Sequence, residues 1–276
     1  MAINRWLMDD PQKRRDDPAL LAFWQVHTGE RWRGLLIGDG WTFDSQTQSY
    51  TAASGSAPTQ ADIRALALSF MASVSDSLSE AAKPVAGQSV IDRQKIVEMT
   101  AKIRRDTEDE FILLAALAAG GLSNLTDDDW RDIEGSAVAG QDVGVGLADV
   151  RWRLDRFAGQ IERGEAGDMA DITDRAGMYS QGGYQVMEAV RRNSHARATG
   201  DDGQPLFTHE RNLLDPFADH CEDSDLAPGC VEETERGWVR IGELSSPGER
   251  TCGLSCHCAL EFGNEDNGTD LLGSPR

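Results

Sequence analysis

Cysteine is absent from the first 220 residues of this 276-residue chain, and positive charge is scarce throughout. The 27 Lys and Arg residues face 47 Asp and Glu residues, which leaves a net charge of −20. Binding to nucleic acid or to an anionic membrane surface relies on Lys and Arg, so this balance argues against both partners. The imbalance by itself indicates only solubility and self-repulsion.

Long apolar runs are missing as well. The longest, from Phe111 to Leu122, has 12 residues, whereas a membrane-spanning helix needs about 20. The N-terminal residues contain no apolar segment of the kind found in signal peptides. We therefore expect a protein made in the cytoplasm, where cysteines stay reduced and a cysteine cluster more often binds metal or catalyses a reaction.

The motifs of common enzymes are also missing. The chain has no P-loop, no H-E-x-x-H pair and no G-x-S-x-G turn. A G-x-G at Gly144 to Gly146 has neither a preceding strand nor a third glycine at the right spacing. The sequence therefore predicts no enzyme and no catalytic residue.

Composition and hydrophobic periodicity divide the chain into four regions. These are an N-terminal arm with a hairpin (1–58), a helical domain (59–198), an acidic Cys-rich module (199–262) and a flexible tail (263–276). In the arm, 31–37 and 41–44 predict two strands around the turn Gly38-Asp39-Gly40. The expected fold class is mainly α, with short strands in the C-terminal module.

Five stretches of the helical domain repeat apolar residues at helical spacing. They cover 63–78, 91–117, 126 onward, 150–161 and 168–192. Pro84 and Gly87 predict the end of the first helix, and Gly120-Gly121 the C-cap of the second. Thr126, followed by three Asp, predicts an N-cap. The large side chains expected in the core include Trp130, Trp152, Met169, Met178 and Tyr179.

The five cysteines all lie between residues 221 and 258. With the neighbouring histidines they follow the order His220-Cys221-x8-Cys230-x21-Cys252-x3-Cys256-His257-Cys258. Two pairs of thiols about 20 residues apart indicate a closed structural zinc site. The predicted ligands are Cys221, Cys230, Cys252 and Cys256, with Cys258 as a substitute.

A metal is also a physical need of this segment. From Asp201 onward the chain carries 17 acidic residues against five Arg, and few large apolar side chains. Such a segment cannot build a large core, and a tetrahedral metal ion can replace one. Trp238 is expected to form what small core there is, and 238–241 and 259–262 predict the only strands.

Other interpretations of the same residues stay open. Free thiols, disulfides formed late or a catalytic cysteine would use the same side chains. His220 is a candidate for an alternative ligand or for a partner of a ligand. His257 would point away if both of its neighbours bind metal, and His195 is expected to be a satisfied or surface residue.

One ordered set of C-terminal elements carries a family resemblance. It consists of Asp219-His-Cys221, Gly237-Trp-Val-Arg-Ile-Gly-Glu-Leu244, Pro247-Gly248 and Cys252-x3-Cys256-His-Cys258-Ala-Leu-Glu-Phe262. This set resembles the C-terminal signature of bacteriophage head-morphogenesis proteins, also called minor head or minor capsid proteins. Weaker matches extend the resemblance over about residues 30–262. Ser224 stands where the family has the second cysteine of its first pair, and an insertion over 224–229 moves that cysteine to Cys230.

The resemblance implies a portal-associated structural protein of the virion. Such a protein takes part in virus assembly and binds portal, major capsid or neck proteins, with multiple copies in the assembly. Zinc would then be a structural metal. Two alternatives are a zinc-dependent hydrolase or nuclease, which needs an open metal position and a general base, and a regulatory zinc module that binds host proteins.

Overall fold

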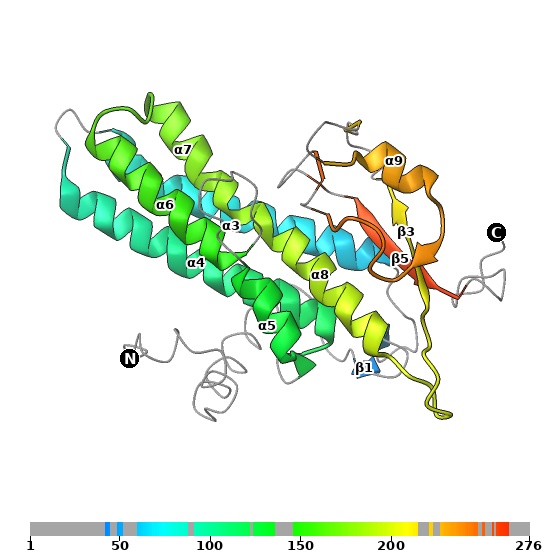
Figure 1. Ribbon diagram of the computed structural model, residues 1–276. Coiled ribbons are helices and arrows are strands. Elements are labelled where there is room, and N and C mark those ends of the chain that lie inside the picture. Colours follow the sequence, from blue (N-terminus) through cyan, green and yellow to red (C-terminus); the bar gives the residue numbers. More distant parts are fainter. Residues whose placement is uncertain are drawn as a thin grey trace.

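The computed structural model describes residues 42–44, 49–51, 60–87, 91–121, 124–135, 146–214, 221–222, 227–247, 250–251, 256 and 258–264. The protein is mainly helical over these residues, with a small three-stranded sheet and a cysteine cluster near the C-terminal end (Figure 1). The predicted mainly α class is confirmed.

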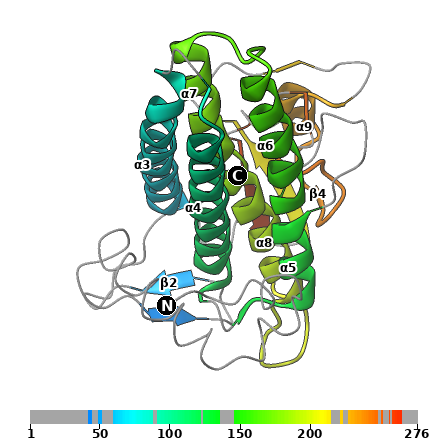
Figure 2. The ribbon, with the colours of Figure 1, turned by 90° about the vertical axis from the view of Figure 1, so that its left-hand side faces the viewer.

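The helices run alongside one another in a bundle, which Figure 2 shows from the side. They are α3 (Gln60–Ala86), α4 (Arg93–Ala119), α5 (Asp127–Glu134), α6 (Leu147–Glu162), α7 (Met169–Gly177) and α8 (Gly182–Arg197), with a 3-10 turn, η3 (Met178–Ser180), between the last two. Within the described ranges, none of the helices combines the length and the apolar character needed to cross a membrane.

Helix α4 lies at the centre of the bundle, because it contacts α3, α5, α6 and α8. Every residue from Glu110 to Ala119 is buried. This segment contains most of the longest apolar run of the sequence, and a helix that is apolar on all sides is buried on all sides. The apolar run therefore marks the core of the bundle.

The caps of α4 and α5 are confirmed as predicted. Gly120 ends α4 in the left-handed conformation with a φ of 75°, which glycine adopts without steric penalty. The Thr126 side chain accepts from the Asp129 N–H, and the Asp129 carboxylate accepts from the Thr126 N–H. Asp129 is fully buried and also pairs with Arg197 at 2.9 Å, so the cap of α5 fixes this helix against α8.

The predicted end of the first helix at Pro84 and Gly87 is confirmed, because α3 ends at Ala86, directly before Gly87. One predicted helix was wrong. The stretch 168–192 is not one helix, since η3 separates α7 from α8. This turn lets α7 pack on α3 while α8 packs on α4.

Three side chains predicted in the core are exposed. Trp152 is 37% exposed and lies beside the Arg156 guanidinium, and Met169 and Met178 are exposed as well. In α6 the buried side chains recur at helical spacing through Leu154, Phe157 and Ile161. Trp152 lies off that stripe. Trp130 and Tyr179 are buried as expected.

The C-terminal strands form an antiparallel sheet in the order β4-β3-β5. The strands are β3 (His209–Leu213), β4 (Val239–Arg240) and β5 (Ala259–Gly263). The two predicted strands, β4 and β5, are confirmed, but the central strand was missed. Its buried residues, Glu210 and Asn212, are polar, so the alternation along β3 carries no apolar signal.

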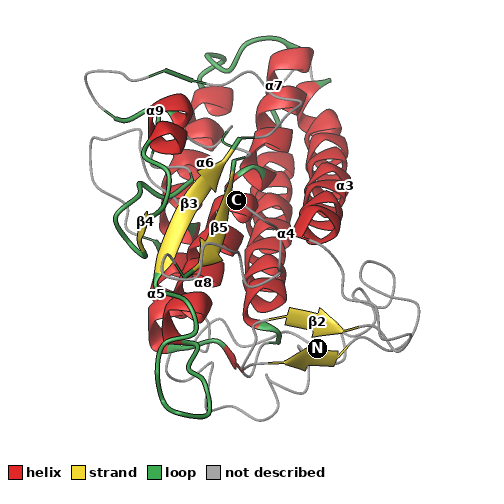
Figure 3. Cartoon of the chain, turned by 90° about the vertical axis from the view of Figure 1, so that its right-hand side faces the viewer, coloured by secondary structure: helices red, strands yellow, loops and turns green. Residues whose placement is uncertain are grey.

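Strand β5 lies against α8 (Figure 3), and a small apolar cluster packs between the sheet and the end of this helix. Its buried members are Ala198, Phe207, Leu244, Leu260 and Phe262. Trp238 is not among them, contrary to the prediction. Its half-buried ring lies under the Arg211 guanidinium at 4.8 Å and against Gly263, where a side chain would not fit.

Near the N-terminus, β1 (Thr42–Asp44) pairs with β2 (Ser49–Thr51) in antiparallel register, with Phe43 opposite Tyr50. The predicted strand over 41–44 is thus found from residue 42. Its expected partner, 31–37, and the turn at 38–40 lie outside the described residues. The same holds for residues 52–59 and 265–276.

The contact between α4 and α8 leads to a prediction for Gly182. A methyl group there would lie 2.6 Å from Phe111 Cζ, inside van der Waals contact. We expect Gly182→Ala to lower the free energy of unfolding by about 1–3 kcal/mol, measured by urea denaturation. Gly159→Ala in α6 is the control, because it faces only the flexible end of Arg163, and it should raise stability by about 0.5–1 kcal/mol. Equal effects of both substitutions would contradict the close contact.

Candidate metal centre

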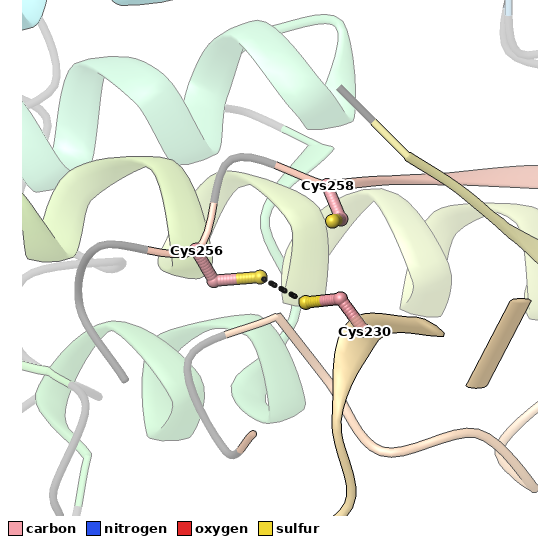
Figure 4. A group of neighbouring side chains, drawn as sticks. All are labelled: Cys230, Cys256 and Cys258. Atoms are coloured by element: carbon pink, nitrogen blue, oxygen red, sulfur yellow. Dashed lines mark hydrogen bonds between the residues drawn. The ribbon is translucent and has the colours of Figure 1, made fainter. Parts of the chain in front are cut away.

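Three cysteines from two segments meet in the C-terminal module. Cys230 is the first residue of α9 (Cys230–Glu235), and Cys256 and Cys258 lie just before β5. Figure 4 shows the sulfur atoms of Cys230 and Cys256 pointing toward each other, with Cys258 beside them. The three residues thus converge although 25 residues separate Cys230 from Cys256 in the chain.

The sulfur atoms form a compact group. All three lie within 4.8 Å of one another, and the Cys230 and Cys256 Sγ atoms are 3.6 Å apart. The side chains are 1%, 1% and 2% exposed, and none of the three takes part in a disulfide. Buried thiol groups at this spacing can share one metal ion, and they form the only such group among the described residues.

Amide side chains hold the backbone of this group in place. Asn212 Nδ2, from β3, donates to the Cys230 carbonyl at 3.1 Å and to the Thr234 hydroxyl at 2.7 Å. Gln185 Nε2, from α8, donates to the Cys256 carbonyl at 3.0 Å. One cysteine is therefore fixed to the sheet and another to the helical bundle.

A buried arginine completes the surroundings of the cluster. Arg250 is 2% exposed, and its Nη1 donates to Asn212 Oδ1 at 2.6 Å and approaches Cys230 Sγ at 3.9 Å. Its Nε and Nη2 donate to the Ser245 carbonyl at 3.1 and 2.8 Å. The guanidinium is thus held in one orientation, with one edge toward sulfur.

The electrostatics of the group favour a cation. Hydrogen bonds with the Cys230 and Cys256 sulfurs, and then burial, raise the pKa of the Cys258 thiol far above its ordinary value. Burial alone lowers the pKa of the Arg250 guanidinium, but the three sulfurs outweigh burial and the net shift is upward. Three thiolates so close together need positive charge, which Arg250 and a metal ion can supply.

The structure brings together three of the five candidate ligands. Cys258, predicted only as a substitute, lies in the group together with Cys230 and Cys256. Cys221 packs at the edge of the cluster, where its Sγ accepts from the Cys230 N–H at 3.3 Å, and it is not one of the three sulfurs within 4.8 Å. Cys252 lies outside the described residues, as do the two histidines considered above, His220 and His257.

Sequence reasoning missed Arg250 and Asn212. Arg250 carried a usable signal, since it is one of five arginines in an acidic segment and lies two residues before Cys252. Asn212 carried none, because a polar residue in a polar stretch predicts a surface position. Its role follows only from the sheet that buries it.

Polar side chains of α8 attach β5 to the bundle. Glu188 Oε2 accepts from the Leu260 N–H at 3.0 Å, and the Arg191 guanidinium donates to the Leu260 carbonyl. Glu188 and Arg191 also pair with each other at 2.7 Å. Both backbone groups of Leu260 on the β5 edge facing α8 are satisfied in this way.

A second ion pair attaches the central strand, β3, to α8. Arg192 Nε donates to Glu210 Oε2 at 2.9 Å, and Glu210 Oε1 accepts from the N–H groups of Gly242 and Leu244 at 3.0 and 3.2 Å. We call Gln185, Glu188, Arg191 and Arg192 the α8 polar face. Because it also holds the Cys256 carbonyl, this face positions the sheet and the cysteine cluster together.

His195 is a satisfied core residue, as predicted. Its Nδ1–H donates to the Arg191 carbonyl at 2.7 Å, and its ring stacks on Phe262 with a centroid distance of 4.2 Å. Burial first, and then the Arg191 charge, lower its pKa to about 3. The ring is therefore neutral in the folded protein.

The chain matches no protein-family model, no curated protein and no solved structure. The resemblance to phage head-morphogenesis proteins therefore stays a prediction from the sequence motifs.

The burial of His195 predicts that the free energy of unfolding decreases as the pH falls. Its folded pKa of about 3 lies below the unfolded value of 6.5, so the stability it contributes is complete above pH 6.5 and is lost as pH falls toward 3. Between pH 7 and pH 5 this loss amounts to about 2 kcal/mol. His195→Phe keeps an aromatic ring beside Phe262 and should lose that much less than the wild type over this interval in urea denaturation. An identical loss in both proteins would contradict the assignment.

Proposed function

We propose that the cysteine cluster is a structural zinc centre and that the chain is a minor head protein of a phage-type virion. The observation that carries the metal assignment is the spacing of the buried sulfurs. Sulfurs about 2.3 Å from a tetrahedral zinc ion lie about 3.8 Å from one another. The 3.6 Å between Cys230 and Cys256 Sγ is close to this value.

Zinc also fits the donor set. Thiolate ligands select zinc, copper(I) and iron–sulfur clusters over the harder divalent ions. A zinc ion would be held by Cys230, Cys256 and Cys258, and its charge would stabilise their thiolates. Cys221 and Cys252 are the two candidates for a fourth ligand, and a fourth thiolate would close the site.

A structural role fits better than catalysis. A zinc hydrolase keeps an open position for water and places a general base beside it. The three sulfurs are at most 2% exposed, and within the described residues the ligand group contains neither a histidine nor a carboxylate. These features favour a centre that stabilises the fold over the alternative of a zinc-dependent hydrolase or nuclease.

The assignment to a virion is supported by the ordered C-terminal motif set. The net charge of −20 suits docking on other proteins better than gripping packaged DNA. On this proposal the partners are portal, major capsid or neck proteins, in multiple copies. A regulatory module that binds host proteins is the competing function, and it predicts absence from mature particles.

Metal content tests the zinc centre. We expect about one zinc per chain in the purified protein by inductively coupled plasma mass spectrometry. The double variant Cys256→Ser/Cys258→Ser should lose the zinc and unfold the C-terminal module, because the module depends on the metal for its core. Leu213→Ser, an exposed position of β3, is the control and should keep the zinc.

Circular dichroism and limited proteolysis complete this experiment. The double variant should keep most of its helical signal, since α3 to α6 contain none of the cysteines. It should become susceptible to protease cleavage in residues 199–262. Unchanged zinc content and an unchanged melting profile in the double variant would refute the centre.

Quantitative mass spectrometry of density-purified particles that carry this gene tests the virion assignment. A fixed low copy number relative to the major capsid protein is the result expected of a portal-associated head protein. Hundreds of copies would indicate a shell or decoration role instead. Complete absence from the particles would contradict the virion assignment and favour the regulatory alternative.

A further inference from the structure

Arg250 differs from two arginines of α8 in what neutralises its charge. Arg191 pairs with Glu188 at 2.7 Å, and Arg192 pairs with Glu210 at 2.9 Å. In the described part of the chain, Arg250 has no carboxylate within 4.0 Å. Its polar partners there are a carbonyl, an amide oxygen and the Cys230 sulfur.

A guanidinium does not lose its proton in a protein, so Arg250 remains charged at 2% exposure. A buried charge without an opposite charge is strongly destabilising, whereas carbonyl and amide oxygens offer only dipoles. Among the polar partners of Arg250 that the structure describes, only sulfur can carry a full negative charge. The surroundings of Arg250 are therefore complete only when the cysteine cluster is anionic.

We propose that Arg250 is the counter-charge of the metal–thiolate cluster, a positioning residue that raises metal affinity without binding the metal. The inference depends on the metal centre proposed above. A zinc ion with three thiolates carries one net negative charge, and a fourth thiolate adds another. Arg250 offsets one of these charges, because its Nη1 lies 3.9 Å from Cys230 Sγ in a site that excludes water.

The contacts of Arg250 make this compensation directional. Asn212 Oδ1 and the Ser245 carbonyl hold the guanidinium from the sides, so Nη1 faces Cys230 Sγ. The same Asn212 side chain donates to the Cys230 carbonyl. Asn212 thus fixes both the ligand, Cys230, and its counter-charge, Arg250. Removing a side chain that supports a metal ligand in this way lowers the affinity for the metal.

The test uses Arg250→Met and Arg250→Lys in the full chain. Methionine removes the charge, whereas lysine keeps the charge and loses the planar fork that reaches Asn212 and Ser245. Zinc affinity is measured by competition with a chromophoric chelator, and the sulfur-to-metal charge-transfer bands are recorded after substitution with cobalt(II). Arg211→Met is the control, since Arg211 is an arginine of the central strand β3 with a carboxylate partner, Glu261.

We expect Arg250→Met to bind zinc about 10–100-fold more weakly than the wild type and to shift the charge-transfer bands. Arg250→Lys should stay within about fivefold of the wild type, and Arg211→Met should keep the wild-type affinity and spectrum. If Arg250→Met does not fold, the zinc affinity of Arg250→Lys still tests whether the charge is what matters. A tenfold or greater loss with lysine would show that the hydrogen bonds of the fork matter and would overturn the charge role.

The two proposals fail in different ways. If the wild type binds zinc and the Arg250→Met variant binds it with equal affinity, only the role of Arg250 is overturned. Wild-type protein that binds neither zinc nor cobalt overturns the metal centre and, with it, this inference.

Discussion

The ion pair between Glu188 and Arg191, with its two hydrogen bonds to Leu260, is the contact on which the C-terminal module depends. Among the described residues, five buried apolar side chains form the cluster beside the sheet, with three partly buried ones packed on it, so the apolar core here is small. The charged pair supplies what a neighbouring strand would supply, a donor and an acceptor for the edge of β5. Because both side chains are almost completely buried, removing either would leave the other without its partner.

The same face of α8 links the cysteine cluster to the helical bundle. Gln185 binds the Cys256 carbonyl, one turn before Glu188. From the opposite side, Asn212 of β3 binds the Cys230 carbonyl. The cluster therefore lies at the joint between the sheet and the helices, so the zinc binding proposed above would be coupled to the docking of the module on α8. An independent zinc finger, in contrast, folds around its metal without such a support.

Features set by neighbouring residues were predictable, and features set by distant contacts were not. The caps at Gly120 and Thr126 were correct because a cap depends on a few adjacent residues. Strand β3 was missed because Glu210 and Asn212 are buried through partners on α8 and α9, which are remote in the sequence. Spacing indicated a cysteine cluster, but it could not rank Cys258 above Cys221, since that ranking depends on how β5 and α9 meet.

The burial of the cluster indicates that, within the proposed function, the metal centre stabilises the fold and other surfaces recognise the partner. The three sulfurs have almost no exposed surface, and the Cys230 and Cys256 carbonyls are bound by side chains of the same chain. These three cysteines accordingly offer a partner almost no surface to contact. In a virion protein its contribution would be indirect, because it fixes the sheet on α8 and thereby the surfaces around the sheet. Portal or capsid recognition would then depend on those surfaces, and loss of the metal would impair assembly by releasing them.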